Sequence, residues 1–138
     1  MSYFLLTVKH HMSAGHRIKG LPGPGAKCTN LHGHTFGIEW TFRVPSAGAE
    51  EIEFAAVKKV LRNWVDEQLD HGFIVYEKDL KVIEALVALE CKFALVDDWP
   101  TTEVIARTIA EYVPDPYAHH LHSVKITEGP HNEAVYYV

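Results

Sequence analysis

The sequence predicts an α+β fold in which a four-stranded antiparallel sheet carries helices on one face. Two long segments, residues 3–12 and 32–44, alternate apolar and polar residues, which is the period-two pattern of half-buried strands. After the second of these segments, apolar residues recur at helical spacing over residues 54–69. Two further strands are predicted at residues 120–128 and 133–138, and this order of elements favours an antiparallel α+β sheet.

The first two predicted strands place their apolar side chains at even positions. In the first strand these are Phe4, Leu6, Val8 and Met12, and in the second Phe36, Ile38, Trp40, Phe42 and Val44. His16 continues the even parity of the first strand, and His34 shares that of the second. The segment between them, residues 20–25, contains three glycines and two prolines and is expected to be a loop.

The middle of the chain is expected to be mainly helical. The helix over residues 54–69 places Val57, Leu61 and Val65 on one side, and Gly72 is expected to act as its C-terminal cap. Asp79 can cap a second, shorter helix, which precedes a short strand at residues 92–96. A third helix is predicted to begin at residues 100–101 and to end before residues 114–116, where two prolines follow.

Histidines at the start of the second strand predict a metal site. His32 and His34 point to the same face of a strand, roughly 6.6 Å apart along the backbone, and Gly33 between them carries no side chain. His16 offers a third imidazole, and three neutral imidazoles with an open fourth position are typical of catalytic zinc. A single histidine on an apolar face is more often a hydrogen-bonded core residue, but the His-x-His pair favours the metal.

Length and composition describe one ordinary domain, residues 1–138. The hydrophobic fraction of 47% and the charged fraction of 22% are those of an ordinary packed protein. The formal net charge of -5 gives no indication of binding to nucleic acid or to an anionic membrane surface. Neither a signal peptide nor a segment of transmembrane length is visible, and two cysteines do not make a disulfide framework, so a cytoplasmic location is expected. Arg17, Lys19 and Lys27 either bind an anionic ligand or are solvated loop residues.

The odd positions of the predicted strands form a second, polar face. It carries Thr7, Lys9, Glu39, Thr41, Arg43, Lys125 and Thr127. Such a face is either solvated or lines the inside of a barrel formed between subunits.

Two further sites carry side chains suited to proton transfer. Cys28 lies next to Lys27 and four residues before His32, and both the lysine and a nearby cation would favour its thiolate form. Asp70 and His71 supply a histidine with an adjacent carboxylate, which can set the tautomer of the imidazole. Each site also has a simpler interpretation. A single free cysteine is commonly a small buried hydrophobic residue, and an Asp-His dipeptide at a helix end is commonly an exposed charge next to a surface histidine.

Taken together, the motifs resemble the 6-pyruvoyl-tetrahydropterin synthase / 6-carboxy-tetrahydropterin synthase family. They are His16, Cys28-x-x-x-His32-Gly33-His34, Leu69-Asp70-His71, Pro100-Thr101-Thr102-Glu103 and Glu128, in family order across nearly the whole chain. The resemblance implies a tunnelling fold (T-fold) whose subunits close a β-barrel ring, as a homo-trimer or homo-hexamer. It implies Zn²⁺ on the three histidines, catalytic roles for Cys28, Asp70, His71 and Glu128, and pterin binding by Glu128 with Thr101, Thr102 and Glu103.

The three-residue gap between Cys28 and His32 resembles the bacterial 6-carboxy branch, which serves queuosine and other 7-deazapurine pathways. The implied reaction converts 7,8-dihydroneopterin triphosphate to 6-carboxytetrahydropterin, acetaldehyde and triphosphate. The alternatives are 6-pyruvoyl-tetrahydropterin synthesis by triphosphate elimination, and a non-catalytic ring protein that binds zinc or pterin. The chain departs from the family at Val104, where asparagine is common, and in the segment 72–99, which contains an apparent extra helix.

Overall fold

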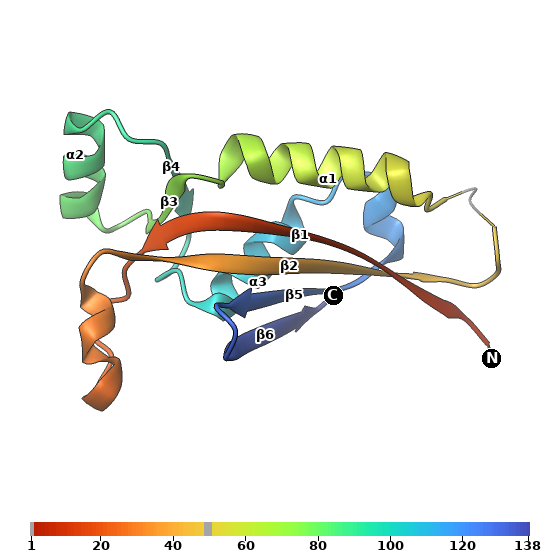
Figure 1. Cartoon of the computed structure of the whole chain (residues 1–138), viewed down its shortest axis with the longest axis horizontal. Coiled ribbons are helices and arrows are strands. Elements are labelled where there is room, and N and C mark those ends of the chain that lie inside the picture. Colours follow the sequence, from red (N-terminus) through yellow and green to blue (C-terminus); the bar gives the residue numbers. More distant parts are fainter. Residues whose placement is uncertain (1, 49–50) are drawn as a thin grey trace.

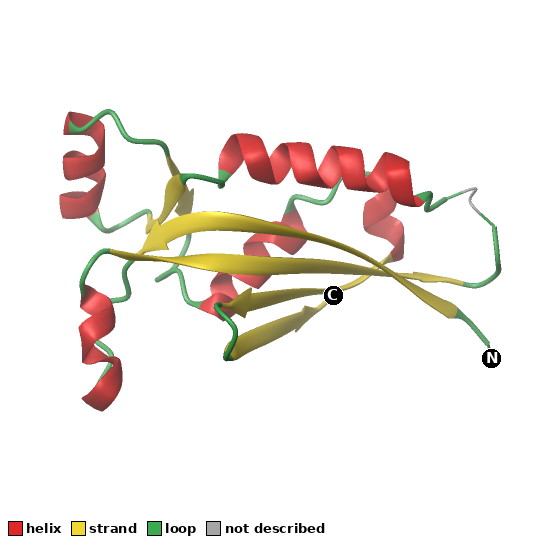
Figure 2. Ribbon diagram, in the orientation of Figure 1, coloured by secondary structure: helices red, strands yellow, loops and turns green. Residues whose placement is uncertain are grey.

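The computed structural model describes residues 2–48 and 51–138 and shows a long, curled sheet with helices around it (Figures 1 and 2). The elements in chain order are β1 (Phe4–His16), the 3-10 helix η1 (Gly23–Thr29), β2 (His32–Val44), α1 (Phe54–Gln68), β3 (Gly72–Tyr76), α2 (Leu80–Ala88), β4 (Phe93–Val96), α3 (Thr102–Glu111), the 3-10 helix η2 (Tyr117–His120), β5 (Leu121–Glu128) and β6 (Asn132–Tyr137). The predicted α+β class is confirmed.

The sheet is mixed, which corrects the prediction of four antiparallel strands. Over the described ranges it has six strands in the order β4-β3-β1-β2-β5-β6. The four expected strands pair antiparallel, whereas β3 pairs parallel with β1 and with β4. The β3–β4 pair is parallel because α2 connects these strands, and a helical crossover returns the chain in the same direction.

One face of the sheet carries the main core. Most even positions of β1 and β2 are buried there, with Phe36, Ile38 and Phe42 completely inaccessible and Trp40 nearly so. Phe4, at the start of β1, is exposed instead of lying in the predicted core. Helices α1 and α3 cover this face and contribute a second apolar layer: Val57, Leu61, Val65, Val104, Ile105, Ala106, Ile109 and Ala110. The helical spacing of these residues puts them on single sides of their helices, as the sequence predicts.

Helix α2 packs on the opposite face, which corrects the prediction that every helix lies on one face. Ile74 of β3 belongs to the main core, whereas its neighbour Val75 packs with Val82 and Leu86 of α2 in a separate cluster. Successive residues of a strand point to opposite faces, so α2 must lie across the sheet from α1 and α3. Asp79, expected to cap this helix, makes no side-chain cap hydrogen bond.

The carboxyl end of α1 differs from the expected glycine cap. The helix ends at Gln68, His71 takes the left-handed conformation at φ 61°, and Gly72 begins β3 instead. Gly72 is needed for a close approach, because a Cβ at this position would lie 3.0 Å from Lys92 Cγ and 3.1 Å from Lys92 O. The motif Asp70-His71-Gly72 is therefore a tight link between α1 and β3.

The odd-numbered face carries a polar ladder across the strands. Glu39 lies 3.8 Å from Lys9 Nζ and 3.1 Å from Lys125 Nζ, and Lys125 also lies 3.7 Å from Glu133. Such cross-strand pairs of opposite charge stabilise neighbouring strands. Within the part of the chain that the structure describes, no helix has the length and apolar composition needed to cross a membrane.

Candidate metal centre and active site

The three predicted metal histidines meet at one end of the β1–β2 pair. His16 lies directly opposite His32 in the antiparallel register, and Ala14 lies opposite His34. The ring centroid of His16 is 4.6 Å from that of His32 and 5.3 Å from that of His34, and the last two are 5.0 Å apart. One potential ligand nitrogen from each ring lies within 4.8 Å of the other two, so the group can hold a metal ion.

Backbone carbonyls orient two of these rings. The Nδ1 atom of His16 lies 2.8 Å from the Pro100 carbonyl oxygen, and that of His32 lies 2.6 Å from the Asn30 carbonyl oxygen. A carbonyl oxygen only accepts, so Nδ1 carries the proton in each ring and Nε2 presents its lone pair. Hydrogen bonding of the second ring nitrogen is the usual support for a metal-binding histidine.

Two of the Nε2 atoms are buried without a partner, on His16 and on His34. Buried polar atoms are almost always hydrogen-bonded, and leaving one unpaired costs about 1–3 kcal/mol. The nearest carboxylate oxygen to His34 Nε2 belongs to Glu128 at 3.5 Å, which is too long for a hydrogen bond. Converging, unpaired imidazole lone pairs fit a zinc ion, since zinc binds neutral imidazole nitrogen.

The environment keeps His16 neutral. Burial lowers the pKa of His16, with the neighbouring His32 and His34 acting in the same direction, and the Pro100 hydrogen bond and the Glu128 charge oppose this only in part. His16 is only 1% exposed. A metal-binding histidine must be deprotonated at the ligating nitrogen, so this shift favours metal binding at lower pH.

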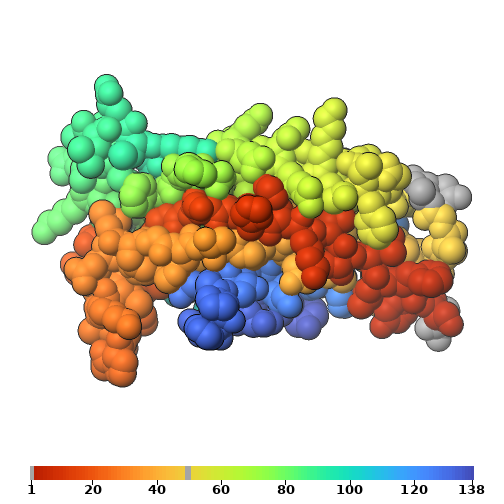
Figure 3. All heavy atoms as spheres, viewed as in Figure 1, coloured from red at the N-terminus to blue at the C-terminus, as the bar shows by residue number. Residues whose placement is uncertain are grey.

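Cys28 lies in η1, which projects from the end of the sheet where β1 ends and β2 begins (Figures 1 and 3). The Cys28 carbonyl accepts a hydrogen bond of 2.8 Å from the Ile18 amide, which ties η1 back to the chain just after His16. The thiol is free and half-buried. Within the described residues the metal-binding group consists of the three histidines, so a fourth position is not closed by Cys28.

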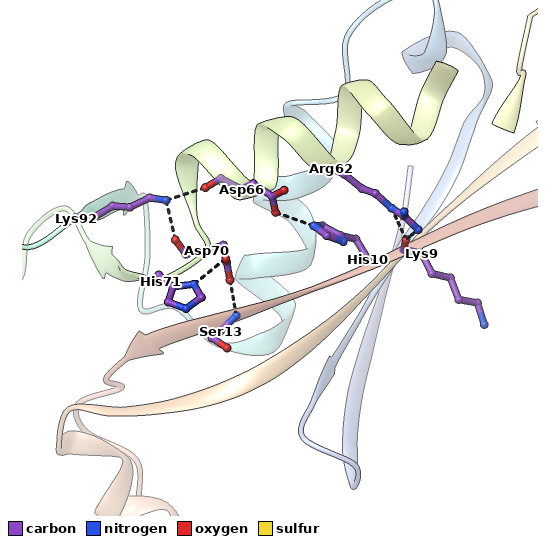
Figure 4. Close-up of polar contacts among 8 residues, drawn as sticks. All are labelled: Lys9, His10, Ser13, Arg62, Asp66, Asp70, His71 and Lys92. Carbon is purple, nitrogen blue, oxygen red and sulfur yellow. Dashed lines mark hydrogen bonds and ion pairs between the residues drawn. The ribbon is translucent and has the colours of Figure 1, made fainter. Parts of the chain in front are cut away.

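Asp70 and His71 face each other, as the prediction of a proton-transfer pair requires. His71 Nδ1 lies 2.7 Å from Asp70 Oδ2, and Asp70 Oδ1 accepts a hydrogen bond of 2.8 Å from the Ser13 amide (Figure 4). Burial raises the pKa of Asp70, but the Ser13 amide, His71 and Lys92 outweigh it and hold the pKa below its ordinary value. Asp70 is thus ionised and keeps the imidazole proton on Nδ1.

His71 and two of the candidate metal histidines, His32 and His34, share one surface depression. It has a volume of about 650 Å³, and Ser13, His32, His34, His71 and Phe73 are among the residues that line it. The His71 side chain is 81% exposed, so its Nε2 atom is open to a molecule in the depression. A ligand bound there can contact both the candidate metal centre and the Asp70–His71 pair.

Glu128, the predicted pterin anchor, lies beside the metal centre. Its Oε2 atom accepts a hydrogen bond of 3.1 Å from the Thr102 hydroxyl, and Oε1 is the atom 3.5 Å from His34 Nε2. The Thr101 hydroxyl caps α3 by accepting from the Val104 amide at 3.2 Å, and Glu103 is exposed in the first turn of the helix. The substrate-binding roles of Thr101, Thr102, Glu103 and Glu128 stay predictions.

The sequence did not reveal several contacts that support the site. Arg17, considered for anion binding, makes two hydrogen bonds of 2.7 Å to the Asp79 carboxylate, so its guanidinium is already engaged. Ser13 binds the Asp70–His71 link, and the Pro100 carbonyl orients His16. These partners are separated by 57 to 84 positions in the chain, and no local pattern signals such pairs.

The fold and the site together define an α+β protein with a candidate three-histidine metal centre at the end of two paired strands. Comparison with known families makes this more specific. The model of the 6-pyruvoyl tetrahydropterin synthase family matches residues 5–138. The chain therefore belongs to the 6-pyruvoyl tetrahydropterin synthase family.

Curated relatives are proteins named 6-carboxy-5,6,7,8-tetrahydropterin synthase. The protein from Rickettsia felis is 30% identical over 105 residues, 72% of each chain, and that from Haemophilus influenzae is 29% identical over 118 residues, 80% of this chain and 84% of the other. The relative from Rickettsia bellii is 32% identical over 80 residues, 55% of this chain and 54% of its own length, so that match spans about half of it.

Solved structures share the fold across the whole chain. An uncharacterized protein from Wolinella succinogenes superposes with a TM-score of 0.83 at 18% identity, covering 99% of each chain. The 6-pyruvoyl tetrahydropterin synthase of Caenorhabditis elegans gives a TM-score of 0.69 at 21% identity, covering 100% of this chain and 97% of the other. These likenesses confirm the family fold expected from the motifs.

Proposed function

We propose that the protein is a zinc-dependent 6-carboxy-5,6,7,8-tetrahydropterin synthase, a carbon-carbon lyase that acts on 7,8-dihydroneopterin triphosphate. One observation carries the proposal: three histidines converge at the end of β1 and β2 with two unpaired, buried Nε2 atoms. The relatives from Rickettsia felis and Haemophilus influenzae, both named for this activity, support the carboxy branch over the pyruvoyl branch.

In this proposal His16, His32 and His34 hold the zinc ion through their Nε2 atoms. Bound zinc supplies Lewis acidity, which polarises substrate side-chain oxygens and makes the neighbouring C–H bonds more acidic. The Pro100 and Asn30 carbonyls keep the ligating rings in the required tautomer. The fourth position stays open to the substrate, as in catalytic rather than structural sites.

Cys28 is the proposed base. As a thiolate it removes a proton from the substrate side chain, and its place on η1 beside Ile18 keeps it at the end of the sheet that carries the histidines. His71 is the proposed proton carrier. Its Nδ1 proton is held by Asp70, so the exposed Nε2 atom can take up and release protons during triphosphate loss and carbon-carbon cleavage.

Glu128 is the proposed anchor of the pterin ring. A carboxylate accepts two parallel hydrogen bonds from a ring N–H and an exocyclic amine. Thr102 orients this carboxylate through its hydroxyl, and Thr101 and Glu103 are proposed to assist from the start of α3. Glu128 Oε1 lies 3.5 Å from His34 Nε2, so a ring bound by this carboxylate would lie beside the candidate metal centre.

We also propose a ring-shaped homo-oligomer, a trimer or a hexamer made of two trimers, of single-domain subunits. The support is the charged ladder on the odd-numbered sheet face and the position of β6 at the edge of the sheet, where its outer side can pair with another subunit. Closure into a barrel would remove such an edge.

The test is incubation of the zinc-loaded protein with 7,8-dihydroneopterin triphosphate, followed by detection of acetaldehyde and 6-carboxytetrahydropterin. Both products are expected. Accumulation of 6-pyruvoyltetrahydropterin without acetaldehyde would move the chain to the pyruvoyl branch while leaving the metal and base assignments intact. Pterin binding with neither product would favour the non-catalytic ring protein.

A further inference from the structure

The loop that carries Asp70 and His71 is held by β1 on one side. The Ser13 amide donates to Asp70 Oδ1 at 2.8 Å, and the His71 amide donates to the Ser13 carbonyl at 2.7 Å. His71 needs this support because its φ of 61° lies in the left-handed region, which costs a non-glycine residue free energy. Such a conformation persists only where the surrounding contacts enforce it.

Lys92 holds the same loop on the other side (Figure 4). Its Nζ atom donates to the Asp66 carbonyl at 2.9 Å and to the Asp70 carbonyl at 2.7 Å. The Asp70 amide, which would continue the helix by bonding to the Asp66 carbonyl, bonds to the Val65 carbonyl instead. The ammonium group therefore satisfies carbonyls that the end of α1 leaves free, and its charge suits the negative end of the helix dipole.

The backbone of Lys92 is itself fixed against the loop. Its carbonyl accepts a hydrogen bond of 3.0 Å from the Phe73 amide, at the point where β3 and β4 begin to pair. The lysine stem passes over Gly72, where any Cβ would lie 3.0 Å from Lys92 Cγ. The lysine thus approaches the loop from the link between α2 and β4, where the sequence predicts the start of a short strand.

We propose that Lys92 is a positioning residue for the proposed proton-transfer pair: by binding the Asp66 and Asp70 carbonyls it fixes the loop so that Asp70 keeps the proton on His71 Nδ1. The expected effect of Lys92 on turnover rests on the proposed function, whereas its expected effect on the loop and on the His71 tautomer does not. Lys92 acts through His71 and does not bind the substrate. Loss of the ammonium group releases one side of the loop, and His71 then exchanges between its two tautomers.

The test compares the zinc-loaded wild-type protein with Lys92→Met, which keeps the stem over Gly72 and removes the donors. Lys92→Arg restores the charge and donors, and Lys59→Met removes an exposed lysine from α1 as a matched control. Long-range ¹H–¹⁵N spectra report which nitrogen of His71 carries the proton, with His71→Ala assigning its signals. Zinc content and kinetics of turnover are measured on the same samples.

In Lys92→Met the His71 signals are expected to change from the Nδ1–H tautomer to a mixture, with zinc retained. The kcat value is expected to fall by about 10- to 100-fold, the cost of a small misplacement of a reacting group, with little change in KM. Lys92→Arg should recover part of both effects, and Lys59→Met should match the wild type.

Unchanged His71 signals in Lys92→Met would overturn the inference, whatever happens to the rate. A rise in KM without a fall in kcat would also overturn it, because that pattern indicates a lysine that binds the substrate. If the wild-type protein shows no turnover but Lys92→Met still shifts the tautomer, the proposed function fails and the positioning role of Lys92 stands.

Discussion

The ion pair between Arg17 and Asp79 predicts that the substitution Asp79→Asn strongly lowers the stability of the fold. Asp79→Asn keeps the size of the side chain but removes the charge that faces the guanidinium. Two hydrogen bonds of 2.7 Å join the Arg17 Nε and Nη2 atoms to the two carboxylate oxygens. The Asp79 side chain is 5% exposed and that of Arg17 is 19% exposed, so water compensates little for the lost charge.

The size of the effect follows from burial. Removing one partner of a fully buried pair costs about 3–5 kcal/mol, because the other charge is left uncompensated. Arg17 retains some solvent, and the asparagine oxygen can still accept one hydrogen bond. We therefore expect Asp79→Asn to lower the free energy of unfolding at pH 7 by about 2–3 kcal/mol. Asp97→Asn is the control, since its pair with Arg107 is exposed and should contribute less than about 1 kcal/mol.

The effect should depend on pH. The Arg17 hydrogen bonds hold the pKa of Asp79 below its ordinary value, and burial opposes this only in part. A carboxyl group with a lowered folded-state pKa stabilises the protein fully above its unfolded-state pKa of about 3.9, and this contribution is lost as the pH falls through the folded-state pKa. The difference between wild type and Asp79→Asn should therefore shrink below about pH 4.

Urea unfolding at a fixed protein concentration, followed by circular dichroism between pH 3 and pH 8, measures both quantities. The midpoint at pH 7 is expected to fall by about 1 M or more in Asp79→Asn. A difference no larger than that of Asp97→Asn, or one that stays constant down to pH 3, would refute the assignment of a stabilising buried ion pair.

Three further outcomes follow from the site. His34→Ala should lose most bound zinc by metal analysis, and stoichiometric zinc in His16→Ala, His32→Ala and His34→Ala alike would show that the ion is held elsewhere. Cys28→Ala and His71→Ala should keep zinc and bind pterin but turn over about 10²- to 10⁴-fold more slowly; near-normal rates would remove them from the proton-transfer set. Light scattering should give the mass of a trimer or hexamer, and a stable monomer at micromolar concentration would contradict the proposed ring.

Much of the site was predictable because its signals are local. The parity of His16, His32 and His34 depends only on the alternation of side chains along a strand, and the structure brings the three together in the expected way. Likewise the helical spacing of Val57, Leu61 and Val65 indicates α1 without knowledge of its partner. The face on which a side chain lies can be predicted from its spacing along a single strand or helix, without knowledge of the tertiary structure.

The segment between α1 and α3 shows where such reasoning ends. The short helix α2 and the last strand, residues 92–96, were expected, but β3 was not. The five residues of β3 follow a helix almost directly, and a short apolar run does not distinguish strand from helix. Its parallel pairing with β1 and β4 and the position of α2 on the opposite face depend on where the chain returns in space. Gly72, expected as a helix cap, is instead the first residue of this unit.

The sequence by itself determined which side chains are available and which of them share a face of a strand or a helix. Only the tertiary structure decided which distant groups meet, such as Thr102 with Glu128, Arg17 with Asp79, and Lys92 with the carbonyls at the end of α1. The physical reason is that periodicity records the burial of each residue, whereas a hydrogen bond between elements depends on the register and crossing of the whole sheet.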